Sequence, residues 1–84
     1  MALSDDFQSA VARSKTISSR PSNEDLLSLY GLFKQASVGD ASGKRPGVFD
    51  LKGRAKFDAW SAFKGKSADD AMTEYIALVD KLHG

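Results

Sequence analysis

The sequence contains no cysteine and a single histidine, and these absences remove several classes of site. Without cysteine there is neither a disulfide framework nor a thiolate metal site, which suits a reducing compartment. His83 stands next to the last residue, so we expect an exposed, unpaired histidine rather than a metal ligand or a catalytic base. With no base beside a nucleophile, the sequence predicts neither an enzyme nor a metal or cofactor site.

Long apolar runs and a basic leader are also missing. The apolar stretches extend over only a few residues, far below the ~20 that a membrane-spanning helix needs. Asp5 and Asp6 stand where the charged and apolar parts of a signal peptide would begin. We therefore expect a soluble, cytoplasmic protein, and its 84 residues predict one domain over residues 1–84.

The net charge of +1, from 12 basic and 11 acidic residues, does not provide the basic field of a nucleic-acid-binding domain. The cations are nevertheless concentrated in the middle of the sequence. They are Lys34, Lys44, Arg45, Lys52, Arg54, Lys56, Lys64 and Lys66. If the fold places some of them on one side, a local anion site is possible without a basic protein.

Strand-like alternation is absent as well, and apolar residues recur instead at helical spacing. A first helix is predicted with Ser4 as its N-cap, ending before Pro21. A second helix is predicted from the cap Ser22 to the neighbourhood of Val38, where the pattern fades.

Residues 39–49, GDASGKRPGVF, hold three glycines and a proline and predict an irregular connection. A third helix is expected from its cap Asp50 to Lys64, with Gly65 as the stop. A fourth helix follows Ser67, which resembles the start of a capping box. The fold class is therefore all-α, a four-helix bundle with a long loop between the second and third helices.

Residues 39–44 invite comparison with a phosphate-binding loop, but the match fails. The segment is one residue short, Arg45 stands where serine or threonine is needed, and no strand precedes it.

A better candidate for an anion site lies on the helices. Tyr30 and Lys34 are four residues apart on one predicted face, and Lys52 and Lys56 repeat that spacing. The paired lysines could serve a bound anion or could simply be solvated. Within a helix, Gly53 lowers stability by up to ~1 kcal/mol relative to alanine. One possible reason for a glycine at this position is that it lets a ligand or another backbone come close.

The aromatic side chains allow two interpretations. Phe57, Trp60, Phe63 and Tyr75 are expected mainly in the core of a small bundle. An exposed tyrosine or tryptophan near cations could instead stack on a purine base.

Three segments give the chain a more specific likeness. They are YGLFKQASVGD at residues 30–40, RPGVFDLKGRAKFDAW at residues 45–60 and KGKSADDAMTEYI at residues 64–76. In order and spacing they resemble the acyl-CoA-binding protein family, also called diazepam-binding inhibitor in animals. With Phe7 and Pro21, the resemblance covers essentially the whole chain.

The resemblance implies a four-helix bundle that binds medium- and long-chain acyl-CoA esters without catalysis. Such a protein would buffer these ligands and deliver them to enzymes and membranes through transient contacts, and we expect it to be monomeric. Position by position, Tyr30, Lys34 and Lys56 match the residues that hold the 3′-phosphate of the nucleotide. Tyr75 matches the tyrosine at the adenine end. Further ligand-contacting positions match Lys15 and Lys52.

The resemblance also implies a binding stretch on the second helix from Tyr30 to Lys34. The residues between these two are Gly31, Leu32 and Phe33. A region that lines the acyl chain matches Pro21, Leu26 and Leu27.

The chain departs from the family pattern at a few positions. Phe33 stands where many members have tyrosine, Phe57 replaces a usual tryptophan, and Ser14 falls where an apolar residue is common. The sequence also stops a few residues early, at Gly84. These changes bear on affinity and chain-length preference.

Two other functions compete with an acyl-CoA carrier. A helical interaction module would place a partner peptide in an apolar groove between helices. A nucleic-acid-binding bundle, less compatible with the charge balance, would bind DNA or RNA with steep salt dependence.

Overall fold

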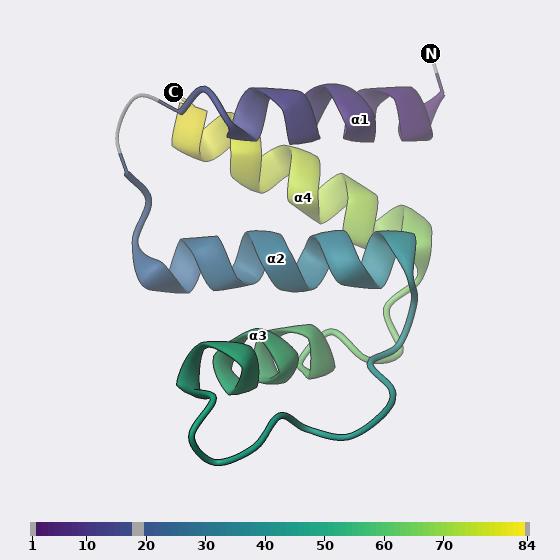
Figure 1. Ribbon diagram of the computed structural model, residues 1–84. Helices are drawn as coiled ribbons and strands as arrows, with labels where there is room; N and C mark the ends of the chain where they lie inside the picture. Colours follow the sequence, from purple (N-terminus) through teal and green to yellow (C-terminus); the bar gives the residue numbers. More distant parts are fainter. Residues whose placement is uncertain (1, 18–19, 84) are drawn as a thin grey trace.

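The structure, a computed structural model, describes residues 2–17 and 20–83 (Figure 1). Within these ranges it contains four helices and no strand. The helices are α1 (Leu3–Ser14), α2 (Asn23–Ser37), α3 (Leu51–Ser61) and α4 (Ala68–His83). The all-α prediction is confirmed, and a long connection separates α2 from α3 as expected.

The predicted caps of the last three helices are in place. The side-chain oxygens of Ser22, Asp50 and Ser67 each accept a hydrogen bond from the backbone N–H three residues later, at 3.0–3.1 Å. Each bond satisfies one N–H that has no partner within the helix. These local signals were therefore sufficient to locate the three helix starts.

The predicted start of the first helix is wrong. Ser4 lies within α1, and the residue before the helix, Ala2, makes no side-chain cap. The backbone carbonyl of Ala2 instead accepts the N–H groups of Asp5 and Asp6, at 3.1 and 3.2 Å. Helical hydrogen bonding thus begins two residues earlier than a cap at Ser4 indicates.

The predicted end of the third helix is also wrong, because α3 ends at Ser61 rather than Lys64. The N–H groups of Phe63 and Lys64 bond to carbonyls three residues back, which tightens the chain into turns. Gly65 then takes a φ of +90°, the left-handed conformation that glycine adopts without steric cost.

The helices pack in the order α1, α4, α2, α3, each against the next, so α1 and α3 lie at opposite edges (Figure 1). The molecule is flat, with extents of 40 × 28 × 15 Å. This order makes α2 the element that connects the edge helix α3 to the rest of the protein.

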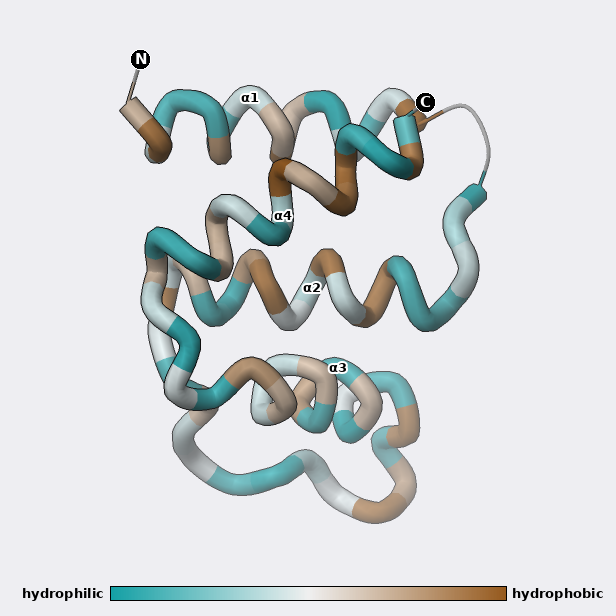
Figure 2. Tube along the Cα trace, turned by 180° about the vertical axis from the view of Figure 1, so that it is seen from behind, coloured by the Kyte–Doolittle hydropathy of each residue, from teal (hydrophilic) through white to brown (hydrophobic). Residues whose placement is uncertain are grey.

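The main core lies where α1, α2 and α4 meet. Phe7, Leu32, Tyr75 and Val79 are at most 4% exposed there. Hydrophobic segments occur on all the helices and again at the end of the α2–α3 connection (Figure 2). In that connection Phe49 is 97% exposed, so its apolar surface contributes nothing to the core.

Hydrogen bonds at Asp40 and at Gly39 help to hold the long connection. The Asp40 carboxylate accepts bonds from the buried Gln35 amide and from the Gly65 N–H, both at 2.8 Å. These two bonds, with the Gly65 bond the larger effect, lower the pKa of Asp40. The Trp60 indole N–H donates to the Gly39 carbonyl at 2.6 Å, which fixes α3 to the end of α2.

Candidate ligand-binding site between α2 and α3

The lysines that the sequence singled out come together with aromatic rings between α2 and α3. The Lys56 ammonium lies 5.5 Å from the centroid of the Tyr30 ring, and that of Lys34 lies 4.9 Å from the centroid of the Trp60 ring. Each ring face attracts the cation above it. The structure thus joins the Tyr30–Lys34 pair to Lys56, and adds Trp60, which sequence reasoning assigned mainly to packing.

No carboxylate competes for these lysines within the described residues. The ion pairs there are Arg13–Asp80, Arg45–Asp58 and Lys66–Glu74. Lys34, Lys52 and Lys56 are absent from all three pairs. Cations that are not engaged in an ion pair leave their charge available to a bound anion.

Gly31 explains how the two helices come close enough to form this arrangement. A Cβ atom at Gly31 would lie 2.6 Å from the Ala59 carbonyl oxygen and 2.7 Å from the Phe63 ring. Only a residue without a side chain allows the α3 backbone to pack so closely on α2. The consequence is that Tyr30 and Lys34 lie directly beside α3.

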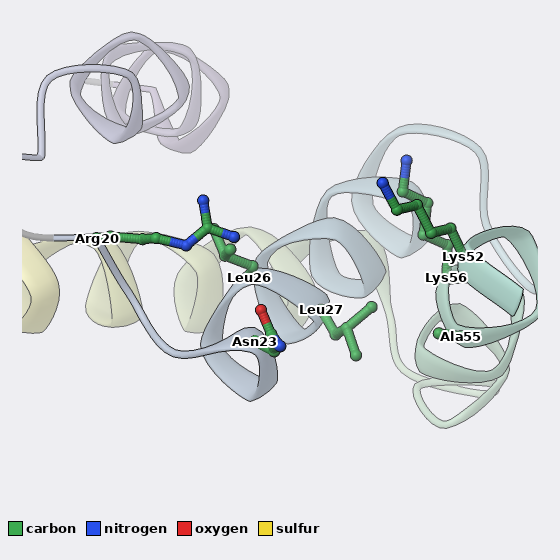
Figure 3. A pocket seen from close by; sticks show the side chains of 7 residues that line it. All are labelled: Arg20, Asn23, Leu26, Leu27, Lys52, Ala55 and Lys56. Atoms are coloured by element: carbon green, nitrogen blue, oxygen red, sulfur yellow. The ribbon is translucent and has the colours of Figure 1, made fainter.

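A pocket of about 330 Å³ opens next to the lysines, along the first halves of α2 and α3 (Figure 3). Its lining residues are Arg20, Asn23, Leu26, Leu27, Lys52, Ala55 and Lys56. The two leucines lie between Arg20 on one side and Lys52 and Lys56 on the other (Figure 3). The pocket therefore combines an apolar floor with Arg20 at one end and two lysines at the other, and none of the described residues that line it is a carboxylate.

A second aromatic cluster lies where α2 meets α1 and α4. Phe33 and Tyr75 both pack against Phe7, with ring centroids 5.9 and 5.1 Å apart. Tyr75 is only 4% exposed, and its hydroxyl donates to the Ser14 hydroxyl at 3.3 Å. The structure thus places Phe33 and Tyr75 away from the pocket, in a cluster that includes a residue outside the predicted site, Phe7.

Comparison with known proteins agrees with this architecture. Residues 4–79 match the model of a family described as "Acyl CoA binding protein". The chain belongs to the acyl-CoA-binding protein family.

Individual relatives cover nearly the whole chain. An acyl-CoA-binding protein of Brassica napus is 52% identical over 82 residues, which are 98% of this chain and 89% of that protein. Acyl-CoA-binding protein homolog 1 of Caenorhabditis elegans is 53% identical over 76 residues, 90% of this chain and 88% of that one. The crystal structure of Oryza sativa acyl-CoA-binding protein 2 superimposes with a TM-score of 0.93 at 48% identity, covering 96% and 90% of the two chains.

The other predicted site residues of this family member occupy varied positions. Leu26, Leu27 and Lys52 line the pocket, whereas Gly31 and Leu32 are buried in the helix interfaces. Pro21 lies between two pocket-lining residues without lining the pocket itself, and Lys15 is exposed at the end of α1. The ligand contacts of all these residues remain predictions.

Sequence reasoning missed three members of the pocket, Arg20, Asn23 and Ala55. Helical spacing provides one signal for Ala55, which lies three residues after Lys52. Arg20 and Asn23 flank the predicted break at Pro21, and no pattern in that break indicates what they face.

A Cβ at Gly53 would collide with the Asp50 carboxylate, so this glycine leaves room for the helix cap. The expectation that His83 is unpaired was wrong. His83 is exposed but not unpaired, because its Nε2 lies 3.2 Å from the Thr16 hydroxyl. That contact exists because the ends of α1 and α4 lie side by side.

Phe57, which stands where the family usually has tryptophan, packs edge-on against Trp60, with ring centroids 6.2 Å apart. It therefore supports the tryptophan beneath Lys34.

Two further properties concern only the described residues. They contain no group of three or more histidine, cysteine, aspartate or glutamate side chains arranged to hold a metal ion. None of their helices combines the length and apolarity needed to cross a bilayer.

Proposed function

We propose that this protein binds medium- and long-chain acyl-CoA esters and acts as a cytoplasmic carrier and pool former. The observation that carries the proposal is the pocket between α2 and α3, where leucines form the floor and two lysines without an ion-pair partner among the described residues stand at the edge. An acyl-CoA has the same two parts, an apolar chain and an anionic nucleotide. Membership of the family supports the same ligand class.

In this proposal the cations bind the phosphates of the nucleotide. Tyr30, Lys34 and Lys56 lie together beside the pocket, and we assign them to the 3′-phosphate. Each charge-assisted hydrogen bond contributes about 1.5–3 kcal/mol net. Because the ammonium groups lie over ring faces rather than beside carboxylates, a phosphate does not have to displace an acidic partner.

The acyl chain belongs in the pocket, over Leu26 and Leu27. Each methylene removed from water contributes ~0.8 kcal/mol, so ten of them would equal the phosphate contacts before the costs of binding are subtracted. Leu26 is 37% exposed in the free protein, so a bound chain would cover apolar surface that now faces water.

The adenine is assigned to the second aromatic cluster on the strength of family likeness. Phe33 is 37% exposed beside the buried Tyr75, and its ring offers a face on which a base could stack. Lys15, at the end of α1, would approach the nucleotide from that side.

We further propose a monomeric protein that catalyses no reaction and passes its ligand on through transient contacts with membranes and acyl-CoA-using enzymes. A peptide-binding helical module is less consistent with the pocket, because a peptide groove has no need of several unpaired cations around its apolar floor.

Calorimetry with CoA, octanoyl-CoA and palmitoyl-CoA tests the proposed ligand. The affinity is expected to rise with chain length until the pocket is full, and free CoA and free palmitate should bind much more weakly. Equal affinities for the three CoA compounds would contradict the proposal.

A further inference from the structure

The end of the pocket away from Lys56 is formed by Arg20 and Asn23 (Figure 3). Arg20 extends toward Leu26 from the segment before α2, and the side chains of Lys52 and Lys56 lie beyond Leu27 on the opposite side (Figure 3). An apolar floor thus separates Lys52 and Lys56 from a single cation, Arg20. The proposed function assigns Lys56 to a phosphate but gives Arg20 no role.

Arg20 is available to a ligand. The structure shows no ion pair between it and any other described residue, and its side chain is exposed. Glu24 and Asp25 follow closely in the sequence, but neither lines the pocket. A guanidinium stays charged throughout the physiological pH range and fits a carboxylate with two parallel hydrogen bonds.

The direction of the acyl chain decides which part of the ligand reaches this end of the pocket. The inference rests on the proposed function. With the nucleotide held at Lys34 and Lys56, a chain that crosses Leu26 and Leu27 brings its far end to Arg20 and Asn23. A terminal methyl group gains nothing from a guanidinium beyond contact with its aliphatic stem. A terminal carboxylate would gain a charged partner and, from Asn23, an amide donor.

We propose that Arg20, assisted by Asn23, forms a second anion subsite that recognises the ω-carboxylate of long-chain ω-carboxyacyl-CoA thioesters. The protein would then carry doubly anionic acyl chains as well as simple ones. Arg20 is the residue that determines this specificity, because it is the only cation among the described residues that line that end of the pocket.

The test compares hexadecanedioyl-CoA with palmitoyl-CoA by calorimetry, in the wild type and in Arg20→Met. Methionine keeps an apolar stem but removes the charge, so we expect hexadecanedioyl-CoA to bind about three- to tenfold more weakly to the variant. Palmitoyl-CoA should change by less than about twofold, since its methyl end loses no charged partner. Arg20→Lys should recover part of the affinity, and Lys44→Met, on the loop outside the pocket, should leave both ligands unaffected.

Each outcome decides one question. Unchanged binding of hexadecanedioyl-CoA to Arg20→Met overturns the subsite. Equal weakening of both ligands also overturns it, because Arg20 would then act on a part that the two ligands share and not on the ω-carboxylate. If palmitoyl-CoA fails to bind the wild type, the proposed function itself fails, and the subsite fails with it.

Discussion

Lys34 and Lys56 hold their ammonium groups over aromatic rings, and neither belongs to an ion pair among the described residues. A cation over a ring face gains about 0.5–1 kcal/mol at an exposed site, less than a charge-assisted bond to phosphate. The rings of Trp60 and Tyr30 therefore position the ammonium groups without holding them too strongly. A carboxylate in the same place would have to be displaced before a phosphate could bind.

Substitutions at these residues should weaken ligand binding. Lys56→Ala removes a charged donor and is expected to reduce the affinity for palmitoyl-CoA by about tenfold or more. Tyr30→Phe keeps the ring beneath Lys56 but removes the hydroxyl, so a loss of about two- to tenfold is expected. Calorimetry gives both values. Lys44→Ala, on the exposed loop, is the matched control, and a larger loss there than at Lys56 would show that the site is misplaced.

Gly31→Ala should destabilise the protein. The added methyl group would meet the backbone of Ala59, which cannot move without shifting α3. A destabilisation of about 1–3 kcal/mol is expected from urea unfolding. Binding of palmitoyl-CoA should weaken too, since the pocket lies between the helices that would be forced apart.

Gly47→Ala provides the control for Gly31→Ala. A Cβ at Gly47 would meet no atom within 4 Å. The free energy of unfolding should therefore change by less than about 1 kcal/mol. Equal destabilisation by the two substitutions would refute the close-packing explanation.

At the scale of elements, α3 depends on a single neighbour. Among the described helices it packs only against α2, whereas α2 and α4 each have two partners. Its remaining attachments are the bonds of the long connection, such as Trp60 to Gly39. An edge helix with one partner opens more readily than helices at the centre of the molecule.

Hydrogen exchange should reveal this difference. In the free protein we expect the amides of α3 to exchange faster than those of α2 and α4. Palmitoyl-CoA should slow exchange more in α3 than in α1, because the bound chain would join α3 to α2 along the pocket. Free CoA serves as the comparison, and protection confined to α1 would place the ligand elsewhere.

The bonds to Asp40 should make the long connection sensitive to acid. The Gly65 N–H and the Gln35 amide lower the pKa of Asp40 in the folded protein. A lowered pKa means that the ionised group stabilises the fold above the unfolded-state pKa of about 3.9, and that this contribution is lost as the pH falls through the folded-state pKa. Asp40→Asn should thus lower the Tm at pH 7, and the difference from wild type should shrink below about pH 4.

Thermal unfolding monitored by circular dichroism from pH 3 to pH 7 measures that difference. Asp58, whose pKa is lowered by its bond to Arg45, titrates in both proteins and cancels in the comparison. A difference in Tm that stayed constant over this range would mean that the Asp40 charge does not contribute.

At the scale of the whole molecule, a flat stack of four short helices buries only a limited area of apolar surface. A domain of this size is only modestly stable by itself, so ligand binding should be visible as stabilisation. The pocket lies at one edge of the stack, yet α2 links that edge to the main core. Stabilising the α2–α3 interface should therefore delay unfolding of the whole chain.

A thermal shift assay measures this coupling. At 100 times its Kd, palmitoyl-CoA should add about 2.7 kcal/mol to the free energy of unfolding. For a domain of this length, that corresponds to roughly 10–20 °C in Tm. Free CoA should produce a smaller shift at the same concentration and DNA none. A shift with DNA but not with palmitoyl-CoA would favour the nucleic-acid alternative.

Local signals in the sequence predicted much of the fold. The caps Ser22, Asp50 and Ser67 act on N–H groups three residues away, so their effect does not depend on the rest of the molecule. The start of the first helix was misplaced, because helical hydrogen bonds begin before the expected cap Ser4. The end of the third helix was misplaced, because the chain tightens into turns after Ser61, before the expected stop at Gly65.

The candidate site was only partly accessible to sequence reasoning. Spacing of four residues paired Tyr30 with Lys34 and Lys52 with Lys56, since such residues share a helix face. Spacing does not indicate which helix faces meet in the fold, so it could not predict that the Tyr30–Lys34 pair lies beside the Lys52–Lys56 pair. Family likeness supplied that link as an expectation.

The sequence by itself determined the all-α class, the missing thiol chemistry and the family, because composition, periodicity and motif order are properties of the chain alone. Tertiary structure alone decided that Trp60 lies beneath Lys34 and that Arg20 completes the pocket. Those positions depend on how closely α3 approaches α2, which is limited by contacts between residues far apart in the chain, such as Gly31 with Ala59.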